Sequence, residues 1–188
     1  MPWLYFSLKP KHQLWAEQWQ QAVQQQLEAL ETVRFGGNCF VAPEAAIFAE
    51  PGRDIITGSN CAIAAECMLH GPIRMGDYVS INHNVTMDGG RLGIEIGSHT
   101  RIASHCRFYA FNHGMAADTF IHQQPVTSKG IRIGKDVWIG AGVSIVDGVE
   151  IGDHAVVGMG SVVTRNVPEY AIVAGNPATT IGDRREKK

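Results

Sequence analysis

The sequence lacks both a long apolar run and a marked excess of charge. No stretch approaches the ~18 consecutive apolar residues that a membrane-spanning helix needs, so we expect no transmembrane span. The formal net charge is −2 over 188 residues, and we therefore expect no basic surface that would bind nucleic acid. The first residues, MPWLYFSLKPKHQ, lack the charged and then apolar regions of a signal peptide, which predicts a cytoplasmic protein.

The sequence also lacks a CxxC pair, although it contains four cysteines. Without such a pair, a zinc site or a redox motif is not indicated. All four cysteines fall at the same inward-facing position of the six-residue repeat described next: Cys39, Cys61, Cys67 and Cys106. Small, weakly polar side chains suit that position, so we expect four buried, reduced thiols.

The most regular feature of the chain is a six-residue repeat between Ile131 and Val167. An aliphatic residue stands at every sixth position, called position i: Ile133, Ile139, Ile145, Ile151, Val157 and Val163. Position i+3 holds Gly, Asp, Asn or His, which tolerate the positive φ of a tight corner better than most residues do. Three such hexads would close one triangular coil, and stacked coils would bury an apolar column. The repeat predicts an all-β solenoid.

The repeat extends back to about Phe35 with three interruptions. Residues 50–54 break the register, three extra residues stand near Gly93, and a long interruption runs from about 109 to 130. Because long loops in compact domains are often functional, the third interruption predicts an extruded loop beside a functional site.

The N-terminal segment has a helical pattern. Between residues 12 and about 31, apolar residues recur at spacings of three and four, namely Trp15, Trp19, Val23, Leu27 and Leu30. We expect this apolar face to pack on, or cap, the open end of the solenoid. The chain then divides into a helical cap at 1–34, a solenoid domain at 35–182 and a charged, frayed tail at 183–188.

Among eight histidines, His113 is the candidate for catalysis. His99, His105 and His154 fall at position i+3, where we expect exposed corner side chains, and the first two are expected to stack at one corner. His113 instead follows Phe108-Tyr109-Ala110-Phe111-Asn112, where the repeat gives out and the long loop departs. This position places an imidazole at a rigid edge beside the loop, which makes His113 a candidate for a catalytic role.

Three segments extend this interpretation: Asn112-His113-Gly114, Gln124-Pro125-Val126 and residues 130–140, GIRIGKDVWIG. Together with the closing residues 174–178, AGNPA, they resemble the sugar and xenobiotic O-acetyltransferases of the hexapeptide-repeat superfamily over roughly residues 57–182. The resemblance implies a left-handed parallel β-helix, a homotrimer with active sites between subunits, acetyl-CoA as acyl donor and no metal. It also implies that His113 is the general base for direct transfer of an acetyl group to a hydroxyl of a sugar or polysaccharide precursor.

The same resemblance suggests binding residues. Asn82 stands where the family has an acceptor-binding asparagine, Asn84 competes with it, and Asp88 is the nearest match to an acidic residue that follows. Trp138 should face outward and meet the acceptor or another subunit. For CoA the resemblance indicates Ala141, Met159, Thr164 and Arg165, with Arg184 and Arg185 as candidates for its phosphates.

Three other functions remain open at this point. An amino-sugar N-acetyltransferase would use the same fold, because an amine also attacks a thioester. A γ-type carbonic anhydrase would need zinc-binding histidines that include an H-x4-H pair, and the sequence has no such pair. A non-catalytic solenoid scaffold would keep the fold without binding acetyl-CoA.

Overall fold

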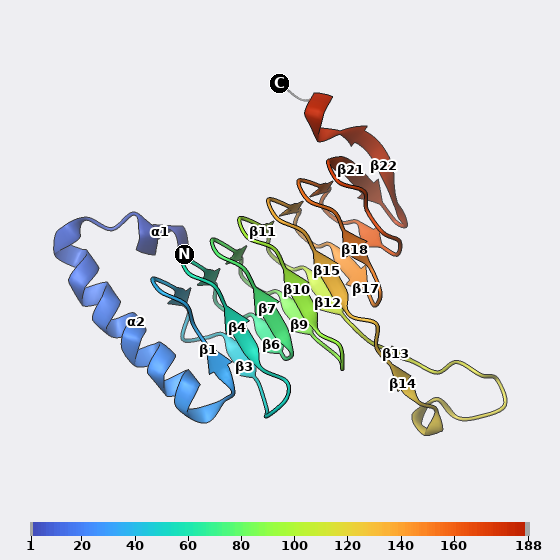
Figure 1. Ribbon diagram of the computed structural model, residues 1–188, viewed down its shortest axis with the longest axis horizontal. Helices are drawn as coiled ribbons and strands as arrows, with labels where there is room; N and C mark the ends of the chain where they lie inside the picture. Colours follow the sequence, from blue (N-terminus) through green and yellow to red (C-terminus); the bar gives the residue numbers. More distant parts are fainter. Residues whose placement is uncertain (1, 187–188) are drawn as a thin grey trace.

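In a computed structural model, which describes residues 2–186, the chain winds into a three-sided solenoid of about six coils (Figure 1). We call its three faces sheets A, B and C. Strands of successive coils pair in parallel and in register, as in β10 with β7 and β15. The expected left-handed parallel β-helix is confirmed.

Each coil contributes one short strand to each sheet. Sheet A contains β1 (Val33–Arg34), β4 (Ile55–Thr57), β7 (Ile73–Met75), β10 (Ile94–Ile96), β15 (Ile131–Ile133) and β18 (Glu150–Ile151). Sheet B contains β2 (Phe40–Val41), β5 (Ala62–Ile63), β8 (Ser80–Ile81), β11 (Arg101–Ile102), β16 (Trp138–Ile139), β19 (Val156–Val157), β21 (Ala171–Gly175) and β22 (Ala178–Asp183). Sheet C contains β3 (Ala46–Phe48), β6 (Met68–His70), β9 (Thr86–Asp88), β12 (Arg107–Tyr109), β17 (Ser144–Val146) and β20 (Val162–Val163).

Aliphatic side chains fill the inside of the prism in continuous columns. The register of sheet B aligns one such column, all of it buried: Val41, Ile63, Ile81, Ile102, Ile139 and Val157. The four cysteines are free and buried beside these columns, as expected. Burial raises the pKa of the Cys67 and Cys106 thiols, which keeps both protonated near neutral pH.

The corners between sheets use left-handed backbone, as the repeat predicts. At the A–B corner φ lies between 52° and 64° for Asn38, Asn60, Tyr78, His99, Asp136, His154 and Tyr170. At the B–C corner it lies between 59° and 70° for Glu66, Asn84, His105, Gly142 and Gly160.

The expected stack of His99 on His105 is wrong. Six residues make only one side of a coil, whereas residues that stack on each other are separated by a full coil of three sides. His99 lies at the A–B corner and stacks on Tyr78, with ring centroids 5.0 Å apart. His105 lies at the B–C corner, where it meets the ring of His83 edge-on at 5.2 Å.

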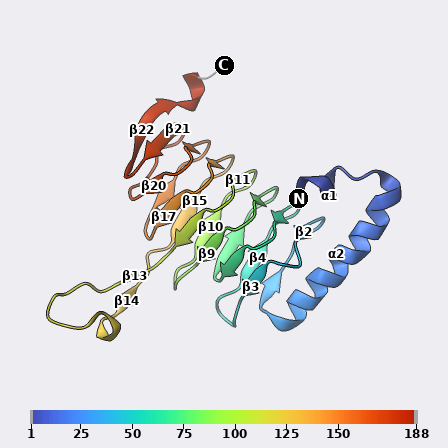
Figure 2. The same ribbon diagram turned by 180° about the vertical axis from the view of Figure 1, so that it is seen from behind.

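All three interruptions of the repeat leave the solenoid at the C–A corner, between β3 and β4, β9 and β10, and β12 and β15. The third projects from the prism (Figures 1 and 2) and is partly structured. It contains the antiparallel pair β13 (Asn112–His113) and β14 (Val126–Thr127) and the 3₁₀ helix η1 (Ile121–Gln123). The loop therefore has a hairpin at its base, which the repeat did not predict.

The N-terminal segment covers the first coil with α1 (Pro2–Phe6) and α2 (Pro10–Leu30). The expected cap is present, and of the expected face Leu27 packs against the core and Trp19 against Phe40. Gln20 is buried, its Nε2 donates to the Val41 carbonyl (3.0 Å) and its Oε1 accepts from the Val41 N–H (2.7 Å). This side-chain amide thus pairs with the open strand edge as a neighbouring strand would. Trp15 and Leu30, expected on the packing face, are exposed.

At the other end, β21 continues sheet B and β22 folds back on it in antiparallel pairing. The expectation of a frayed tail is wrong for residues 183–186, which include the 3₁₀ helix η2 (Arg184–Glu186). Arg184 Nη1 donates to the Asp136 carboxylate (2.9 Å) and to the Asp136 carbonyl (2.9 Å). Residues 187–188 lie outside the described part. Within residues 2–186 no helix has the length and apolarity needed to cross a membrane.

The cap predicts a specific loss of stability. Replacing Gln20 with Ala leaves the N–H and C=O of Val41 without their partners, which should lower the free energy of unfolding by about 1–3 kcal/mol. Urea denaturation of Gln20→Ala against Gln25→Ala measures this difference, since Gln25 lies on the same helix and is exposed. Equal stabilities of the two variants would contradict the capping role.

Candidate active site

His113 is presented by the hairpin at the base of the long loop. It pairs with Val126 across the two strands, and the next residue, Gly114, donates its N–H to the Pro125 carbonyl (3.0 Å). The Phe111 ring meets the His113 imidazole edge-on at 5.9 Å and the Tyr109 ring at 6.1 Å. The imidazole itself is exposed and has no hydrogen-bond partner within residues 2–186. Both ring nitrogens are therefore available to a ligand.

Two side chains fasten the hairpin to the solenoid. Asp147, in the turn between β17 and β18, accepts from the N–H groups of Lys129 and Gly130 at 2.8 and 2.9 Å, and from Asn112 Nδ2 at 3.2 Å. Ser128 Oγ donates to the Ala110 carbonyl at 2.6 Å. The chain on both sides of the loop is thus held at the next coil, which fixes where His113 emerges.

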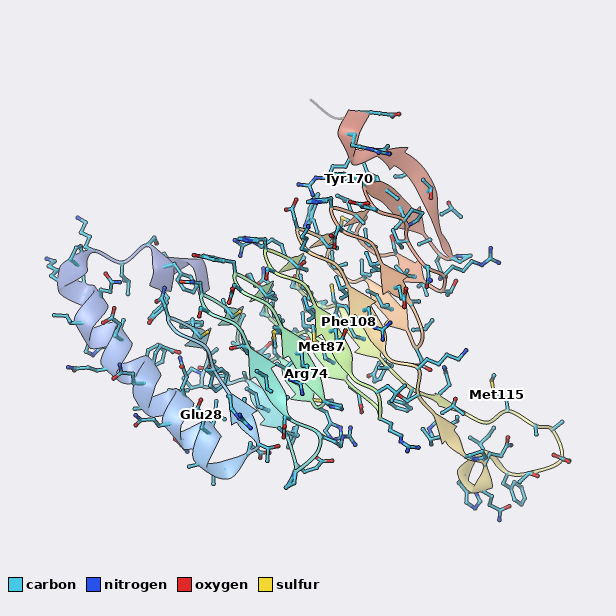
Figure 3. The ribbon with its side chains drawn as sticks, viewed as in Figure 1. Glu28, Arg74, Met87, Phe108, Met115 and Tyr170 are labelled. Carbon is cyan, nitrogen blue, oxygen red and sulfur yellow. The ribbon has the colours of Figure 1, made fainter. Side chains whose placement is uncertain are left out.

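The outer part of the loop is organised by Gln124. Its Nε2 donates to the carbonyls of Ala116 (2.9 Å) and Thr119 (2.7 Å), and its Oε1 accepts from the Ala116 N–H (2.7 Å). Large apolar side chains of this part remain uncovered. Met115, labelled in Figure 3, is 86% exposed and lies away from the prism, and Phe120 and Ile121 are also exposed.

The two candidate asparagines lie on another edge of the molecule, at the B–C corner. Asn82 follows β8 and lines a cavity of about 600 Å³ together with His83 and residues of the first two coils. Asn84 occupies the corner itself with φ +59°, and its Nδ2 lies 3.5 Å from Glu66 Oε2. Because the backbone of Asn84 is needed to turn the corner, Asn82 is the better placed of the two for a ligand.

Asp88 is engaged by its own chain at the C–A corner. Its carboxylate accepts from the Gly90 N–H (3.0 Å) and lies 3.3 Å from His70 Nδ1 and 3.6 Å from Arg53 Nη2. These residues line a cavity of about 510 Å³ that also touches Phe111 and Val126 of the hairpin. Asp88 therefore shares a cavity with the His113 hairpin, whereas Asn82 does not. Most of the hydrogen-bonding capacity of the Asp88 carboxylate is already used by its own chain.

The residues indicated for CoA fall at two corners. Ala141 and Met159 lie one above the other at the B–C corner, where the Gly160 N–H donates to the Ala141 carbonyl (2.8 Å). Thr164 and Arg165 are exposed and follow β20, on the opposite edge of sheet C. Arg184 is held by Asp136, and Arg185 pairs with Asp183 and lies over the Tyr170 ring. One chain does not bring these residues together.

Trp138 faces outward from the middle of sheet B, between Arg101 and Val156 of the neighbouring coils, and is 57% exposed. Its expected orientation is confirmed, although it lies neither at the hairpin nor in the Asn82 cavity.

One cluster within the described chain could in principle hold a metal ion, formed by Asp153, His154 and Glu169 at the A–B corner. His154 Nδ1 is already hydrogen-bonded to Asp136 Oδ2 (2.9 Å), and the pKa of that carboxyl is lowered chiefly by this bond. The cluster is at a different corner from His113.

Comparisons with known proteins agree with the fold and its repeat. The family model described as bacterial transferase hexapeptide (six repeats) matches residues 130–165. The structure of the hexapeptide-repeat acetyltransferase VCA0836 from Vibrio cholerae, complexed with acetyl-CoA, superimposes with a TM-score of 0.61 and 30% identity, covering 83% of this chain and 73% of that one. The chain belongs to the hexapeptide-repeat acyltransferases.

Other members of the family differ in the acyl acceptor. AntD, an N-acyltransferase from Bacillus cereus in complex with dTDP and 3-hydroxybutyryl-CoA, has a TM-score of 0.76 and 28% identity, covering 87% of this chain and 89% of that one. The galactoside O-acetyltransferase of Lactococcus lactis is 28% identical over 93% of this chain and 80% of its own.

The chain spans about half the length of the first curated relatives it matches. One of these, described as a "Probable acetyltransferase" of Mycobacterium tuberculosis, is 34% identical over 72% of this chain and 44% of its own.

Sequence reasoning missed Asp147, Ser128 and Gln124 as residues that position the site. Asp147 and Asn112 are 35 residues apart, and the hexad pattern assigns Asp147 only to a solvent-facing turn. The sequence offered only a weak signal for this anchor, namely a carboxylate in the coil that follows the long loop.

The anchoring by Asp147 predicts a local change in dynamics. Asp147→Ala removes the acceptor shared by Lys129, Gly130 and Asn112, so amide hydrogen exchange across residues 112–130 should accelerate by about tenfold or more while the core strands keep their protection. Asp147→Asn retains one carbonyl oxygen for the two N–H groups, so the amide hydrogens of residues 112–130 should exchange more slowly in this variant than in Asp147→Ala. Unchanged exchange in Asp147→Ala, measured by mass spectrometry, would show that the hairpin is held by other contacts.

Proposed function

We propose that this protein is an acetyltransferase that moves an acetyl group from acetyl-CoA to a hydroxyl of a sugar or polysaccharide precursor, with His113 as the general base. The observation that carries the proposal is the exposed, unpartnered imidazole of His113 on a hairpin fastened by Asp147 and Ser128. The acetyl-CoA complex of VCA0836 and the galactoside O-acetyltransferase of Lactococcus lactis support the donor and the acceptor class.

The reaction needs little beyond a placed base. One nitrogen of the neutral imidazole takes the hydroxyl proton while the oxygen attacks the thioester carbonyl carbon. The tetrahedral intermediate then expels the CoA sulfur, which receives the proton from the imidazolium and leaves as free thiol. No acyl group rests on the protein, in agreement with four cysteines that are buried in the core.

The donor groove in this proposal is the B–C corner of the last coils. Gly142 and Gly160 occupy its turns, and a Cβ built at Gly160 would meet nothing within 4 Å. These two turns therefore carry no side chain, with Ala141 and Met159 as their neighbours, and in this proposal an extended pantetheine arm lies along their backbone. Asn82 lies further along the same corner, toward the N-terminal coils.

A second copy of the chain completes the site in this proposal. The glycine-lined groove and Asn82 share the B–C corner, whereas His113 emerges at the C–A corner of its own chain. A cyclic homotrimer would carry the hairpin of one copy to the B–C corner of the next through a heterologous interface. Burial of Met115, Phe120 and Ile121 against that copy would account for apolar side chains that one chain leaves exposed.

An amino-sugar N-acyltransferase is the second candidate. AntD, which is similar over 87% of this chain, is an N-acyltransferase, and a variant of it is known in complex with dTDP-4-amino-4,6-dideoxyglucose and coenzyme A. An amine needs less help from a base than a hydroxyl does, so dependence on His113 separates the two reactions.

The base assignment predicts the outcome of a thiol-release assay. With acetyl-CoA and a panel of sugars, amino sugars and oligosaccharides, His113→Ala should lower acceptor-dependent release by about 10²–10⁴-fold. His122→Ala is the matched control, because His122 lies on the same loop and stacks only on Phe120. Release that survives in His113→Ala with an amino sugar would favour N-acylation, and release that survives with hydroxyl acceptors would remove His113 from its role.

The split site predicts complementation between two inactive variants. His113→Ala and Asn82→Ala chains, mixed by unfolding and refolding together, should form sites in which an intact His113 meets an intact Asn82 from another copy. Random assembly at equal amounts restores about one quarter of the wild-type sites. A mixture as inactive as its components would place both residues of a site in one chain.

A further inference from the structure

The cavity beside Asn82 has an aromatic wall that belongs to the N-terminal helix. It is lined by Trp19 of α2, by Phe40 and by a set of small residues in the first two coils: Ala42, Pro43, Ala64 and Ala65. The centroids of the Trp19 and Phe40 rings are 6.1 Å apart, and Phe40 is buried. Because these side chains are small, they leave room for the cavity. Trp19, which is 36% exposed, forms one side of it.

Trp19 is held in place by two neighbouring rings. The Trp15 ring stacks on it with an interplanar angle of 7° and a centroid distance of 6.3 Å, and Phe40 packs against it from the solenoid. The next residue, Gln20, fixes α2 to the edge of Val41. The indole is thus a preorganised plane, which reduces the entropy that ligand binding must overcome.

The rim of the same cavity carries polar groups that remain available. Asn82 Oδ1 accepts from the His83 N–H (2.9 Å), which leaves the amide Nδ2 of Asn82 to donate outward. Glu44 also lines the cavity, and its carboxylate has no hydrogen-bond or ion-pair partner among residues 2–186. His83 adds a third polar group, next to His105. A flat aromatic plane facing an amide donor and a carboxylate acceptor fits a ring with one apolar face and hydroxyls at its edge.

We propose that this cavity binds the hexopyranose ring of the acceptor, stacked on Trp19, with its hydroxyl groups bonded to Asn82 and Glu44. The volume of about 600 Å³ is in the range of small-molecule sites and admits one or two sugar rings. An apolar segment of another chain would leave the Glu44 carboxylate and the Asn82 amide without partners, at a cost that a hydroxylated ligand avoids. That the bound sugar is the acetyl acceptor rests on the proposed function. The inference assigns to α2 a part in selecting that acceptor.

Direct binding measurements test the platform without turnover. The probes are methyl glucopyranoside, methyl galactopyranoside and methyl N-acetylglucosaminide, titrated by saturation-transfer NMR into protein with His113→Ala. We expect saturable binding of at least one probe, a Kd raised about tenfold by Trp19→Ala, and a Kd within about threefold of the reference for Trp19→Tyr, which keeps an aromatic plane. Glu44→Gln should weaken binding by a smaller factor.

The matched control is Leu30→Ala, since Leu30 lies on the same helix, is 72% exposed and does not line the cavity. It should leave probe binding unchanged, and thermal unfolding of each variant separates loss of fold from loss of the site. No saturable binding of any probe, or equal binding by the reference and a folded Trp19→Ala variant, would overturn the platform. Binding that depends on Trp19 in a protein without thiol release would retain the platform and refute the acetyltransferase proposal. Thiol release that is unchanged in Trp19→Ala would retain the acetyltransferase proposal and refute the platform.

Discussion

The register between coils is the constraint on which the rest of the structure depends. Each inward aliphatic residue stacks on its counterpart in the next coil, and each corner repeats the same left-handed backbone. A slip of one residue would turn the core columns outward, so the repeat tolerates extra residues only where they can loop out. The chain places all three of its insertions at the C–A corner, and the longest of them carries His113. The register of the prism therefore determines where the loop that carries His113 leaves it.

The fold separates the elements of the proposed site as clearly as it positions them. His113 is fastened at one corner by Asp147 and Ser128, while Asn82, the aromatic cavity and the glycine-lined turns follow one another along a different corner. An acceptor at the N-terminal end of the B–C corner and a donor at its C-terminal end would converge near the middle coils. In the proposed assembly a copy of the same chain approaches there and covers the exposed apolar side chains of the loop. Assembly, in this account, is part of catalysis and not only of stability.

Much of this could be predicted from the sequence, because a six-residue period is a local signal. The buried columns that contain Ile139 and Ile145, the positive φ of Asp136 and the three insertions all follow from residues read in order. What could not be predicted depends on pairs far apart in the chain. Gln20 caps Val41 across 21 residues, Asp147 reaches Asn112 across 35, and Arg184 reaches Asp136 across 48. The helical pattern predicted only part of the packing face of α2. Leu27 packs against the core as expected, whereas the apolar residues Trp15 and Leu30 lie outside and the polar Gln20 lies inside.

The most direct test is an experimental structure of the assembled protein with CoA bound. The account predicts the pantetheine arm along the B–C corner past Gly160 and Gly142, with the thiol near the imidazole of His113 from another copy, roughly 3–4 Å away. It also predicts that Met115 and Phe120 are covered by that copy. A CoA thiol beside His83 or His105 of its own chain, with His113 still facing solvent, would contradict the central claim and assign the base to the corner itself.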